Sequence, residues 1–593
     1  MQNDLNISAL DRAISGIETQ PHESLRMLRE LGGSDSEQDV IESATFSALR
    51  RLNRDHEAIR HIDNAICLAP EHSDHHYNRG VLLRDIGRVS EAEAAFREAI
   101  RLDPENLDAW INLANILSDR RELGEALALL DVVVSRRPGD LNAQNNRLNT
   151  LSSLGRGEEA CLGFAKLVAE HPDNETIRLN FASALHQAGR IEEARRWIQV
   201  RQANGPDMRS ARLHSAKLLH ALGFPDASLS MIQSLVDDAP HDEESLASLC
   251  LAWRAFDPQA PEASAAFARI ERLPGRSHRS ESMISQWKLL NGQFLDGFRA
   301  YESRWFAANG PRASYFGSAP RWNGSDSLSG STIVIHCEQG AGDSIQFSRY
   351  LRLLKSSGAR IILLAPESLK KIFESSAVAE LVLGSDDPLP SHDYHCPLLS
   401  LPYSFKTTLE TIPALTPYLR VSEGDKNAWS ERLGPRRSLR IGLAWSGRRE
   451  NPRDEARSLE FLRFMRALPL GPEYVCLQPE IRHEDAFLMQ ARPDIRHFAD
   501  YLSDYADTAA LVENLDLVVS VDTSVAHLAG ALGKPVWILL PNDPDFRWLL
   551  GREDSPWYPS ARLIRQPSFR DWDSVLARVR DDIIDLIDAE ERA

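Results

Sequence analysis

Short apolar runs separated by polar turns dominate the C-terminal half of the chain. Most positions in each run are hydrophobic, as expected for strands buried on both faces of a parallel sheet. The clearest runs are 332–337 (TIVIHC), 361–365 (IILLA), 439–445 (LRIGLAW), 474–478 (YVCLQ), 515–521 (LDLVVSV) and 536–540 (VWILL). Segments with helical spacing lie between several of them, including 344–354 and 368–374. This alternation predicts an α/β architecture.

The segment 515–540 has the pattern of a strand, a helix and a second strand. Asp522, Thr523 and Ser524 follow the first strand and are residue types that begin helices. A helix N-terminus above a strand presents free backbone N–H groups to a phosphate or diphosphate, and His527 lies one turn into this helix. A buried α/β unit with a capping Asp and a core His explains the same residues. The local pattern leaves both interpretations open.

The N-terminal half instead repeats every 34 residues. Seven prolines keep this spacing, namely Pro70, Pro104, Pro138, Pro172, Pro206, Pro240 and Pro274. Glycines keep a second register at Gly87, Gly155, Gly189 and Gly223, with Arg121 as the exception, and alanines keep a third at Ala58, Ala92, Ala126, Ala160 and Ala194. This period and phase resemble the tetratricopeptide repeat, in which two helices are joined by a turn. The resemblance implies a solenoid whose concave face holds a partner chain.

A row of asparagines follows the same period within the first helix of four repeats, at Asn78, Asn112, Asn146 and Asn180. Asn is a mediocre helix former, and its amide both donates and accepts hydrogen bonds. The row resembles the asparagine ladder of eukaryotic O-GlcNAc transferase, which implies that the backbone of an acceptor polypeptide binds there. The competing interpretation is that these amides pack between helices and satisfy buried carbonyls.

Composition and charge disfavour several classes of protein. The 593 residues are 42% hydrophobic and carry a net charge of −18, which argues against a nucleic-acid partner. No apolar run approaches the roughly 18 residues of a membrane span, and the N-terminus lacks a signal-peptide pattern. The six cysteines are scattered, without a CxxC motif. We therefore expect a cytoplasmic protein with reduced thiols and no membrane insertion.

Motifs in the C-terminal half resemble the heptosyltransferase family of glycosyltransferases. They are HCEQGAGDSIQFSRYL, HCPLLSLPYSF, IGLAWSGRRENPRDEARS and VDTSVAHLAGALGKPVWILLP, the last followed by DFRWL and EDSPWYP. The resemblance spans nearly all of 280–565 and implies a GT-B fold, in which two Rossmann-like halves meet at a cleft. Bacterial proteins of this architecture include transferases that modify flagellin with nonulosonic acids such as pseudaminic acid, and O-GlcNAc transferase also combines repeats with a GT-B region.

The expected organisation is multidomain, with an all-α tetratricopeptide solenoid followed by an α/β GT-B region. The predicted parts are a helical cap at 1–41, the solenoid at 42–275, a helical linker and connector at 276–330, an acceptor-side half at 331–425, a nucleotide-sugar half at 436–570 and a terminal helix at 571–593. Within the linker, 280–306 has a continuous amphipathic pattern that predicts helix.

On the acceptor side, the resemblance assigns the role of general base to Asp343. A carboxylate there would take a proton from the acceptor hydroxyl, if its pKa suits. The competing interpretation is that Asp343 only caps its helix. Gln339, Gln346 and Arg349 are expected to shape the acceptor side.

On the donor side, Asp522, Thr523, Ser524 and His527 match the donor-binding motif of the family. Ser524 and the neighbouring backbone would bind phosphate, and His527 would contact phosphate or the donor sugar. Arg448 and Arg449 stand where the family places basic phosphate-binding side chains, although the family residue is a lysine. Surface arginines with no role are the competing interpretation.

The resemblance implies a protein O-glycosyltransferase that moves a sugar from a nucleotide-sugar to Ser or Thr of an acceptor protein, with flagellin as the expected acceptor. Asp543 and Asp545 spell DxD, a metal-binding motif in other glycosyltransferases, but their place in a proline turn favours a turn role. We expect no metal and no cofactor beyond the nucleotide-sugar, because helix dipoles and cationic side chains stabilise the leaving group in a GT-B site. The alternatives are a non-catalytic repeat scaffold with a degenerate transferase half and an enzyme acting on lipopolysaccharide, like the heptosyltransferases.

Overall fold

The computed structural model describes residues 2–31, 38–52, 54–198, 206–221, 223–306, 319–384, 387–448 and 453–592. The chain divides into two compact units, Met1–Ile232 and Gln233–Ala593. The domain boundaries expected from the sequence stay predictions.

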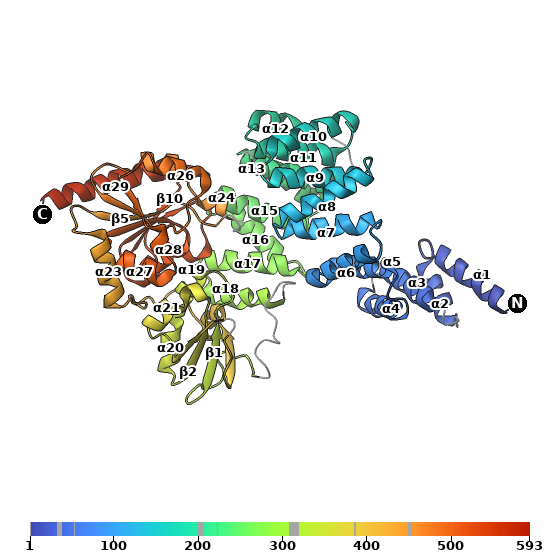
Figure 1. Ribbon diagram of the computed structural model, residues 1–593, viewed down its shortest axis with the longest axis horizontal. Helices are drawn as coiled ribbons and strands as arrows, with labels where there is room; N and C mark the ends of the chain where they lie inside the picture. The colour runs from blue at the N-terminus through green and yellow to red at the C-terminus, as the bar shows by residue number, and fades with distance from the viewer. Residues whose placement is uncertain are drawn as a thin grey trace. The chain divides into compact units, whose positions relative to one another are not determined.

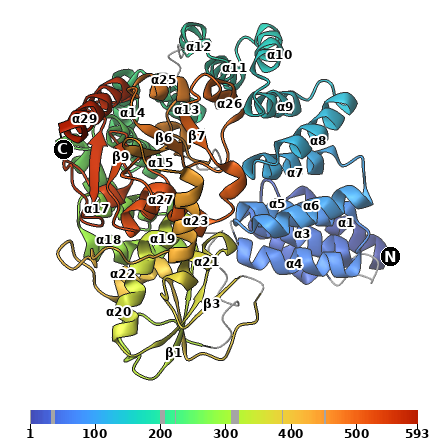
Figure 2. The same ribbon diagram turned by 60° about the vertical axis from the view of Figure 1, so that its left-hand side comes forward.

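The first unit is helical throughout its described residues. Its helices are α1 (Gln2–Ser15), α2 (Pro21–Glu30), α3 (Gln38–Arg51), α4 (Asp55–Leu68), α5 (Ser73–Asp85), α6 (Val89–Leu102), α7 (Leu107–Asp119), α8 (Leu123–Arg136), α9 (Leu141–Ser153), α10 (Gly157–Glu170), α11 (Glu175–Gln187), α12 (Ile191–Trp197) and α13 (Pro206–Ala221), and α14 (Pro225–Asp238) contains the boundary between the units. Consecutive helices from α3 to α8 lie side by side (Figure 2). The alanines at the 34-residue register are all fully buried between these helices, so a small side chain permits their close approach.

The turns inside five helix pairs, from α5–α6 to α13–α14, each have a left-handed residue. Gly87, Gly155, Gly189 and Gly223 have φ between 76° and 86°, a region that L-residues avoid and glycine enters freely. Arg121 adopts the same conformation, with φ 66°, at the one place where the glycine register is broken. The turn geometry is therefore kept even where the sequence supplies the wrong residue type for it.

The prolines of the 34-residue register come just after the second helix of a pair, except Pro206, which begins α13. The carbonyl oxygens of Pro70 and Pro104 accept hydrogen bonds from the side chains of His76 (2.7 Å) and Trp110 (3.2 Å) in the next helix. Gln144 donates in the same way to the carbonyl of Pro138. These bonds tie the end of one helix pair to the start of the next.

The second unit begins with helices. They are α15 (Glu243–Phe256), α16 (Pro261–Glu271), α17 (His278–Leu290), α18 (Phe294–Tyr301) and the 3-10 helix η1 (Glu302–Phe306). The expectation of continuous helix over 280–306 is wrong, because Asn291–Gln293 form a turn in which Gly292 has φ 75°. The chain thus makes another helical hairpin, of the same turn type as in the first unit.

Two parallel sheets follow. The first has the order β3-β2-β1-β4 and the second the order β10-β9-β8-β5-β6-β7. Their strands are β1 (Thr332–His336), β2 (Arg360–Leu364), β3 (Leu381–Leu383), β4 (Tyr394–Pro397), β5 (Arg440–Ala444), β6 (Glu473–Cys476), β7 (Ile495–His497), β8 (Leu517–Val521), β9 (Val536–Leu540) and β10 (Ala561–Arg565). Every residue of β5, β8 and β9 is buried, as the apolar runs predict. The C-terminal region is therefore α/β with parallel sheets.

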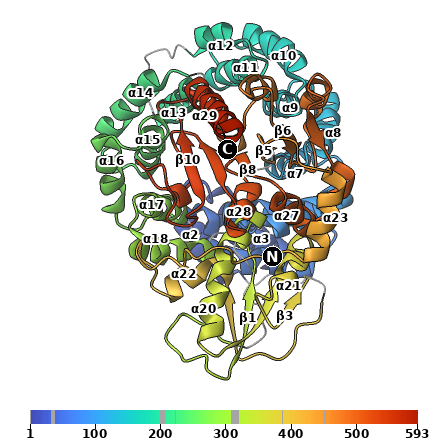
Figure 3. The same cartoon turned by 90° about the vertical axis from the view of Figure 1, so that its left-hand side faces the viewer.

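Helices connect and cover these strands. They are α19 (Ala341–Phe347), η3 (Ser348–Tyr350), α20 (Leu351–Ser356), α21 (Glu367–Ser375), η4 (Leu398–Ser400), α22 (Leu401–Ser404), α23 (Glu423–Leu433), α24 (Asp454–Arg457), α25 (Phe461–Arg466), α26 (His483–Met489), η5 (Ala499–Tyr501), α27 (Tyr505–Glu513), α28 (Ser524–Ala531), η6 (Phe546–Trp548) and α29 (Trp572–Arg592). Figure 3 shows α28 on the side of β8 that faces β1. None of the helices in the described residues is long and apolar enough to cross a membrane.

Aromatic side chains of α18 join the two sheet regions. The ring of Phe298 packs edge-on against Phe347 of α19 (6.4 Å) and against Phe546 of η6 (6.5 Å), and Phe294 contacts Trp557 (5.8 Å). In Figure 1 and in Figure 2, α18 lies beside α19, and α17 contacts η6. The last helical hairpin is thus part of the core between the two sheets and fixes how α19 and η6 approach each other.

The exposed side chain of Arg121 allows a direct test of the turn geometry. Replacing Arg121 by Gly should raise the free energy of unfolding of the first unit by about 1 kcal/mol, because glycine adopts positive φ without a steric penalty. Gly155→Ala is the matched control and should lower the same free energy by about 1 kcal/mol, since Gly155 has φ 80° and no atom within 4 Å of an added Cβ. Chemical denaturation followed by circular dichroism measures both changes, and an Arg121→Gly variant no more stable than wild type would contradict the reasoning.

Candidate functional site

The N-termini of α19 and α28 meet where the two sheets present the carboxyl ends of their strands. A Cβ added at Gly342 would lie 2.9 Å from Cδ2 of His527 and 3.4 Å from Cα of Ser524. Only a residue without a side chain allows this approach. As a result, the residue before Asp343 in the first sheet region lies against Ser524 and His527 of the second. The structure thus brings together the predicted base and the predicted donor motif.

Arg547 connects these groups. Its guanidinium donates to Oδ1 of Asp343 and, at 2.6 Å, to Oδ1 of Asp545, which also accepts the Arg547 backbone N–H at 3.1 Å. Burial raises the pKa of the Asp343 carboxyl, and the positive charge of Arg547 opposes that rise. The pKa of Asp545 is lowered because Arg547 and Arg453 outweigh the effect of burial. One arginine therefore serves two carboxylates from different halves of the unit.

Asp343 also holds the start of its own helix. Its Oδ2 accepts the backbone N–H of Gly340 at 2.9 Å, so the capping interpretation applies as well. The side chain keeps 22% of its surface exposed, and its two oxygens bind different partners. Capping and a chemical role are compatible here, because the cap fixes the carboxylate while part of it still faces solvent.

His527 is buried in α28 and is uncharged. Its Nδ1 lies 3.0 Å from the hydroxyl of Tyr558, and its ring stacks on Trp548 at 5.2 Å. Burial and the nearby arginines lower its pKa to about 3, so the imidazole is neutral. At 3.9 Å from Asp522, Nε2 therefore makes no charged pair, and the ring offers hydrogen bonds instead of positive charge.

The start of α28 is not capped by its own side chains. Thr523 occupies the N-cap position and makes no side-chain cap bond, and the hydroxyl of Ser524 accepts from Tyr505 at 2.8 Å. Of the two interpretations left open by the sequence, the one with a capping Asp does not apply at the N-cap position, which Thr523 and not Asp522 occupies. The pKa of that carboxyl is raised by burial and by the neighbouring charge of Asp545.

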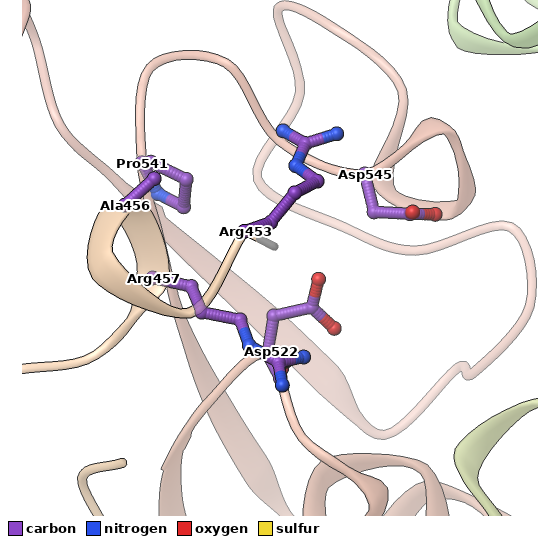
Figure 4. A pocket seen from close by; sticks show the side chains of 6 residues that line it. All are labelled: Arg453, Ala456, Arg457, Asp522, Pro541 and Asp545. Atoms are coloured by element: carbon purple, nitrogen blue, oxygen red, sulfur yellow. The ribbon is translucent and has the colours of Figure 1, made fainter. Parts of the chain in front are cut away.

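A small cavity of about 50 Å³ opens beside this helix end. It is lined by Arg453, Ala456, Arg457, Asp522, Pro541 and Asp545. Figure 4 shows the two arginines coming from one short segment, with Arg457 reaching toward Asp522. Nη1 of Arg457 donates to the carbonyl oxygen of Asp522 at 2.7 Å. The cavity thus brings two guanidinium groups and the carboxylates of Asp522 and Asp545 together beside a helix N-terminus, where backbone N–H groups favour negative charge.

The basic residues predicted for this role are not the ones that line the cavity. Arg448 is exposed, and Arg449 lies outside the described residues. Arg453 and Arg457 of the same motif, GRRENPRDEAR, were missed, as was Arg547. Their spacing of four residues was the available signal, since arginines at i and i+4 lie on one side of a helix.

The DxD carboxylates are both paired with arginines. Asp543 accepts from Nε of Arg254 at 2.7 Å and lies 3.1 Å from Nη2 of Arg453, and Asp545 is held by Arg547 as described. Asn542 adds two bonds of 2.9 Å to the last carbonyls of α15. The turn is thereby anchored to a helical hairpin. Within the described ranges no three His, Cys, Asp or Glu side chains group as metal ligands do.

The predicted acceptor-side residues have different surroundings. Gln339 exchanges hydrogen bonds with the hydroxyl of Tyr301, at 2.9 and 3.2 Å. Gln346 is fully buried. Arg349 is buried too, donates to the Tyr418 hydroxyl at 3.0 Å and lies over its ring. Arg349 therefore binds protein groups, whereas Gln339 lies next to the residues around Asp343.

The asparagine row lies in the first unit. Asn180 is buried and donates to Asn145 at 2.8 Å, and Asn146 donates to Asn115 at 2.9 Å. Nδ2 of Asn112 binds the carbonyl of Asp108 within its own helix at 2.8 Å. Amides between neighbouring repeats thus bond to each other, as the packing interpretation expects. Asn78, Asn112 and Asn146 are only partly buried and keep surface for a ligand.

Comparison with known proteins identifies the helical region. Models of the tetratricopeptide repeat match residues 44–106, 83–146 and 153–217. These helices are tetratricopeptide repeats. The sequence-based interpretation of the 34-residue period is therefore confirmed.

Three individual proteins illustrate the similarity. Protein FlbA of Caulobacter vibrioides is 26% identical over 317 residues, which cover 49% of this chain and 52% of FlbA, so the chain spans about half the length of this relative. A tetratricopeptide repeat protein from Parabacteroides merdae is 13% identical with a TM-score of 0.37, covering 42% of this chain and 98% of that one. YrrB, described as a repeat protein with an unusual peptide-binding site, is 18% identical with a TM-score of 0.24, covering 36% and 91%.

The close approach at Gly342 gives a testable consequence. Gly342→Ala should lower the free energy of unfolding of the second unit by about 1–3 kcal/mol, because the new methyl group forces α19 away from α28. Gly424→Ala is the matched control: an added Cβ there meets its nearest atom at 3.7 Å, and stability should stay within about 1 kcal/mol of wild type. Denaturant unfolding followed by tryptophan fluorescence makes the comparison. Equal stability of the two variants would show that the helices are not held this closely.

Proposed function

We propose that this protein is a metal-independent glycosyltransferase with a GT-B arrangement that modifies Ser or Thr of an acceptor protein. One observation supports the proposal most strongly. A carboxylate of one parallel sheet region and an arginine-lined helix N-terminus of the other converge at the carboxyl ends of their strands. Ligands of doubly wound folds bind at that position.

The donor phosphate is proposed to bind between α28 and the arginines. Arg453 and Arg457 line the cavity, and the helix N-terminus adds backbone N–H groups and a partial positive charge. Positive charge there stabilises the nucleotide as it leaves with the electrons of the broken bond. His527, which is neutral, would hydrogen-bond to the phosphate or to the sugar.

Asp343 is proposed to act as the base. The acceptor hydroxyl oxygen attacks the anomeric carbon, the bond from that carbon to the phosphate oxygen breaks, and the hydroxyl proton moves to the carboxylate. Burial raises the pKa of the Asp343 carboxyl, and a more basic carboxylate accepts the hydroxyl proton more readily. The carboxylate must still be ionised at working pH, which the contact with Arg547 supports.

The tetratricopeptide repeats are proposed to hold the acceptor chain. Such repeats offer extended surfaces for protein partners, and the partly buried amides of Asn78, Asn112 and Asn146 can bond to a polypeptide backbone. Flagellin as acceptor and a nonulosonic acid as sugar come from the family resemblance alone. The reaction would take place in the cytoplasm.

Transfer is tested with a co-expressed acceptor, flagellin first, in a host that makes the sugar nucleotide. Intact-mass measurement should show an added sugar with wild type and a loss of about 10²–10⁴ in rate with Asp343→Asn, because the amide takes up no proton. Asp554→Asn is the control, since Asp554 is a 73% exposed carboxylate of the same unit. If wild type retains the acceptor in a pull-down but adds no mass, the scaffold alternative is favoured.

Acceptor binding is tested through the asparagine row. Replacing Asn112 and Asn146 together by Ala should weaken binding of the acceptor about tenfold, since each hydrogen bond to the backbone contributes about 0.5–1.5 kcal/mol. Asn180 is left unchanged because it is buried and bonded to Asn145. Asn64→Ala, in α4 and outside the row, is the control. Unchanged affinity in a double variant that is folded by circular dichroism would favour the packing interpretation.

A further inference from the structure

Arg547 has an unusual position among the charged groups of the second unit. Its side chain is only 8% exposed and pairs with Asp343 of α19 and Asp545 of its own turn. The guanidinium lies over the ring of Phe546 at 4.4 Å and faces Phe347 at 5.6 Å. The arginine is therefore held by rings and carboxylates from both sheet regions.

The other groups around Asp343 leave its charge dependent on this arginine. The titratable and charged groups around it are Arg547 and Asp545 from the turn after β9, Arg457 from α24, Tyr301 from α18, Cys337 from the end of β1, and His527 of α28, which lies against the neighbouring Gly342. Of these, Tyr301, Cys337 and His527 are uncharged at neutral pH, because burial raises the pKa of the first two and lowers that of the third. Asp545 opposes ionisation of Asp343, and Arg547 is the cation in direct contact.

We propose that Arg547 is the positioning residue of this site, which keeps Asp343 ionised and aims it across the boundary between the two halves. The inference rests on the proposed glycosyl transfer. A guanidinium suits the task because it stays protonated at all working pH values and its fork can bind two carboxylates at once. Asp545 completes the arrangement by fixing the other side of the fork.

The alternative role for Arg547 is direct contact with the donor phosphate. The two roles differ in what they affect. A positioning residue changes the ionisation of Asp343 and therefore the pH dependence of the rate, while a phosphate ligand changes the affinity for nucleotide at every pH. The arginines that line the cavity are Arg453 and Arg457, and Arg547 is not among its lining residues. The geometry thus favours positioning.

The experiment compares Arg547→Gln and Arg547→Lys in the full chain with wild type. Transfer to the acceptor is followed by intact mass from pH 5.5 to 9.5, and binding of UDP, GDP and CMP is measured by calorimetry. For Arg547→Gln we expect the acidic limb of the rate profile to move up by about 1–3 pH units, because loss of an adjacent positive charge raises a carboxyl pKa by about that much. Below the shifted limb, transfer should fall by up to about tenfold for each pH unit of the shift and should recover at high pH, with nucleotide affinity within about threefold of wild type.

Arg547→Lys should retain most of the transfer, since it restores the charge. Arg552→Gln is the matched control. Arg552 follows Arg547 by five residues and pairs with the exposed Asp554, so its replacement should leave the profile unchanged. A uniform loss of rate with an unshifted profile would overturn the positioning role. A loss of nucleotide affinity in Arg547→Gln larger than about tenfold would instead identify Arg547 as a donor ligand.

Failure of the proposed function has a separate signature. If wild type binds nucleotide but adds no sugar to any acceptor, the proposal of glycosyl transfer fails. The ion pair between Arg547 and Asp343 is then tested by measuring protein stability. Arg547→Gln and Asp343→Asn should each lower the denaturation midpoint, and the double variant should lose less than the sum of the two losses. Additive losses would overturn the coupling of these side chains as well.

Discussion

The approach of α19 to α28 at Gly342 is the constraint on which the site depends. In each parallel sheet, the helices that follow the strands begin at the carboxyl edge of the sheet. The two edges form one site only if the N-termini of their helices can come into contact. The missing side chain at Gly342 permits this contact, and Phe298 of α18 packs against α19 and η6. The carboxylate of Asp343 then reaches Arg547, which is 204 residues away along the chain.

Charge balance explains why the site contains so many ionisable groups. Asp522, Asp545 and Asp343 are largely buried together, and carboxylates in such an arrangement raise one another's pKa. Arginines at 453, 457 and 547 offset this repulsion. Losing one partner would leave a buried charge unpaired, which is far more costly than the pair is stabilising. The DxD sequence belongs to this balance through Asp543 and Asp545, whose partners here are guanidinium groups.

Much of the fold could be predicted from periodicity, because hydrophobic spacing and turn residues follow directly from local geometry. The 34-residue prolines and glycines indicated the repeats, and the apolar runs indicated the parallel strands. The helix expected over 280–306 failed because an amphipathic pattern continues across the turn at Gly292. In the site, the family motifs pointed to residues of both sheet regions, and Gly342, beside Asp343, lies against Ser524 and His527. The roles of these residues stay predictions. Arg547 was not predicted, because its contact with Asp343 joins segments 204 residues apart that no local pattern relates. Arg453 and Arg457 were missed although their spacing of four residues was a local signal.

The hydrogen bonds between α15 and the turn after β9 determine where the repeats can be separated from the α/β region. Arg254 is 3% exposed and binds Asp543, and Asn542 closes the carbonyl end of α15. The same turn carries Asp545 and Arg547 of the site. Helices α15 to α18 therefore form one structural unit with the α/β region, even though their hairpins resemble further repeats. Related proteins can exchange tetratricopeptide repeats in evolution or in a chimera. Such an exchange preserves the site only if the junction lies before α15.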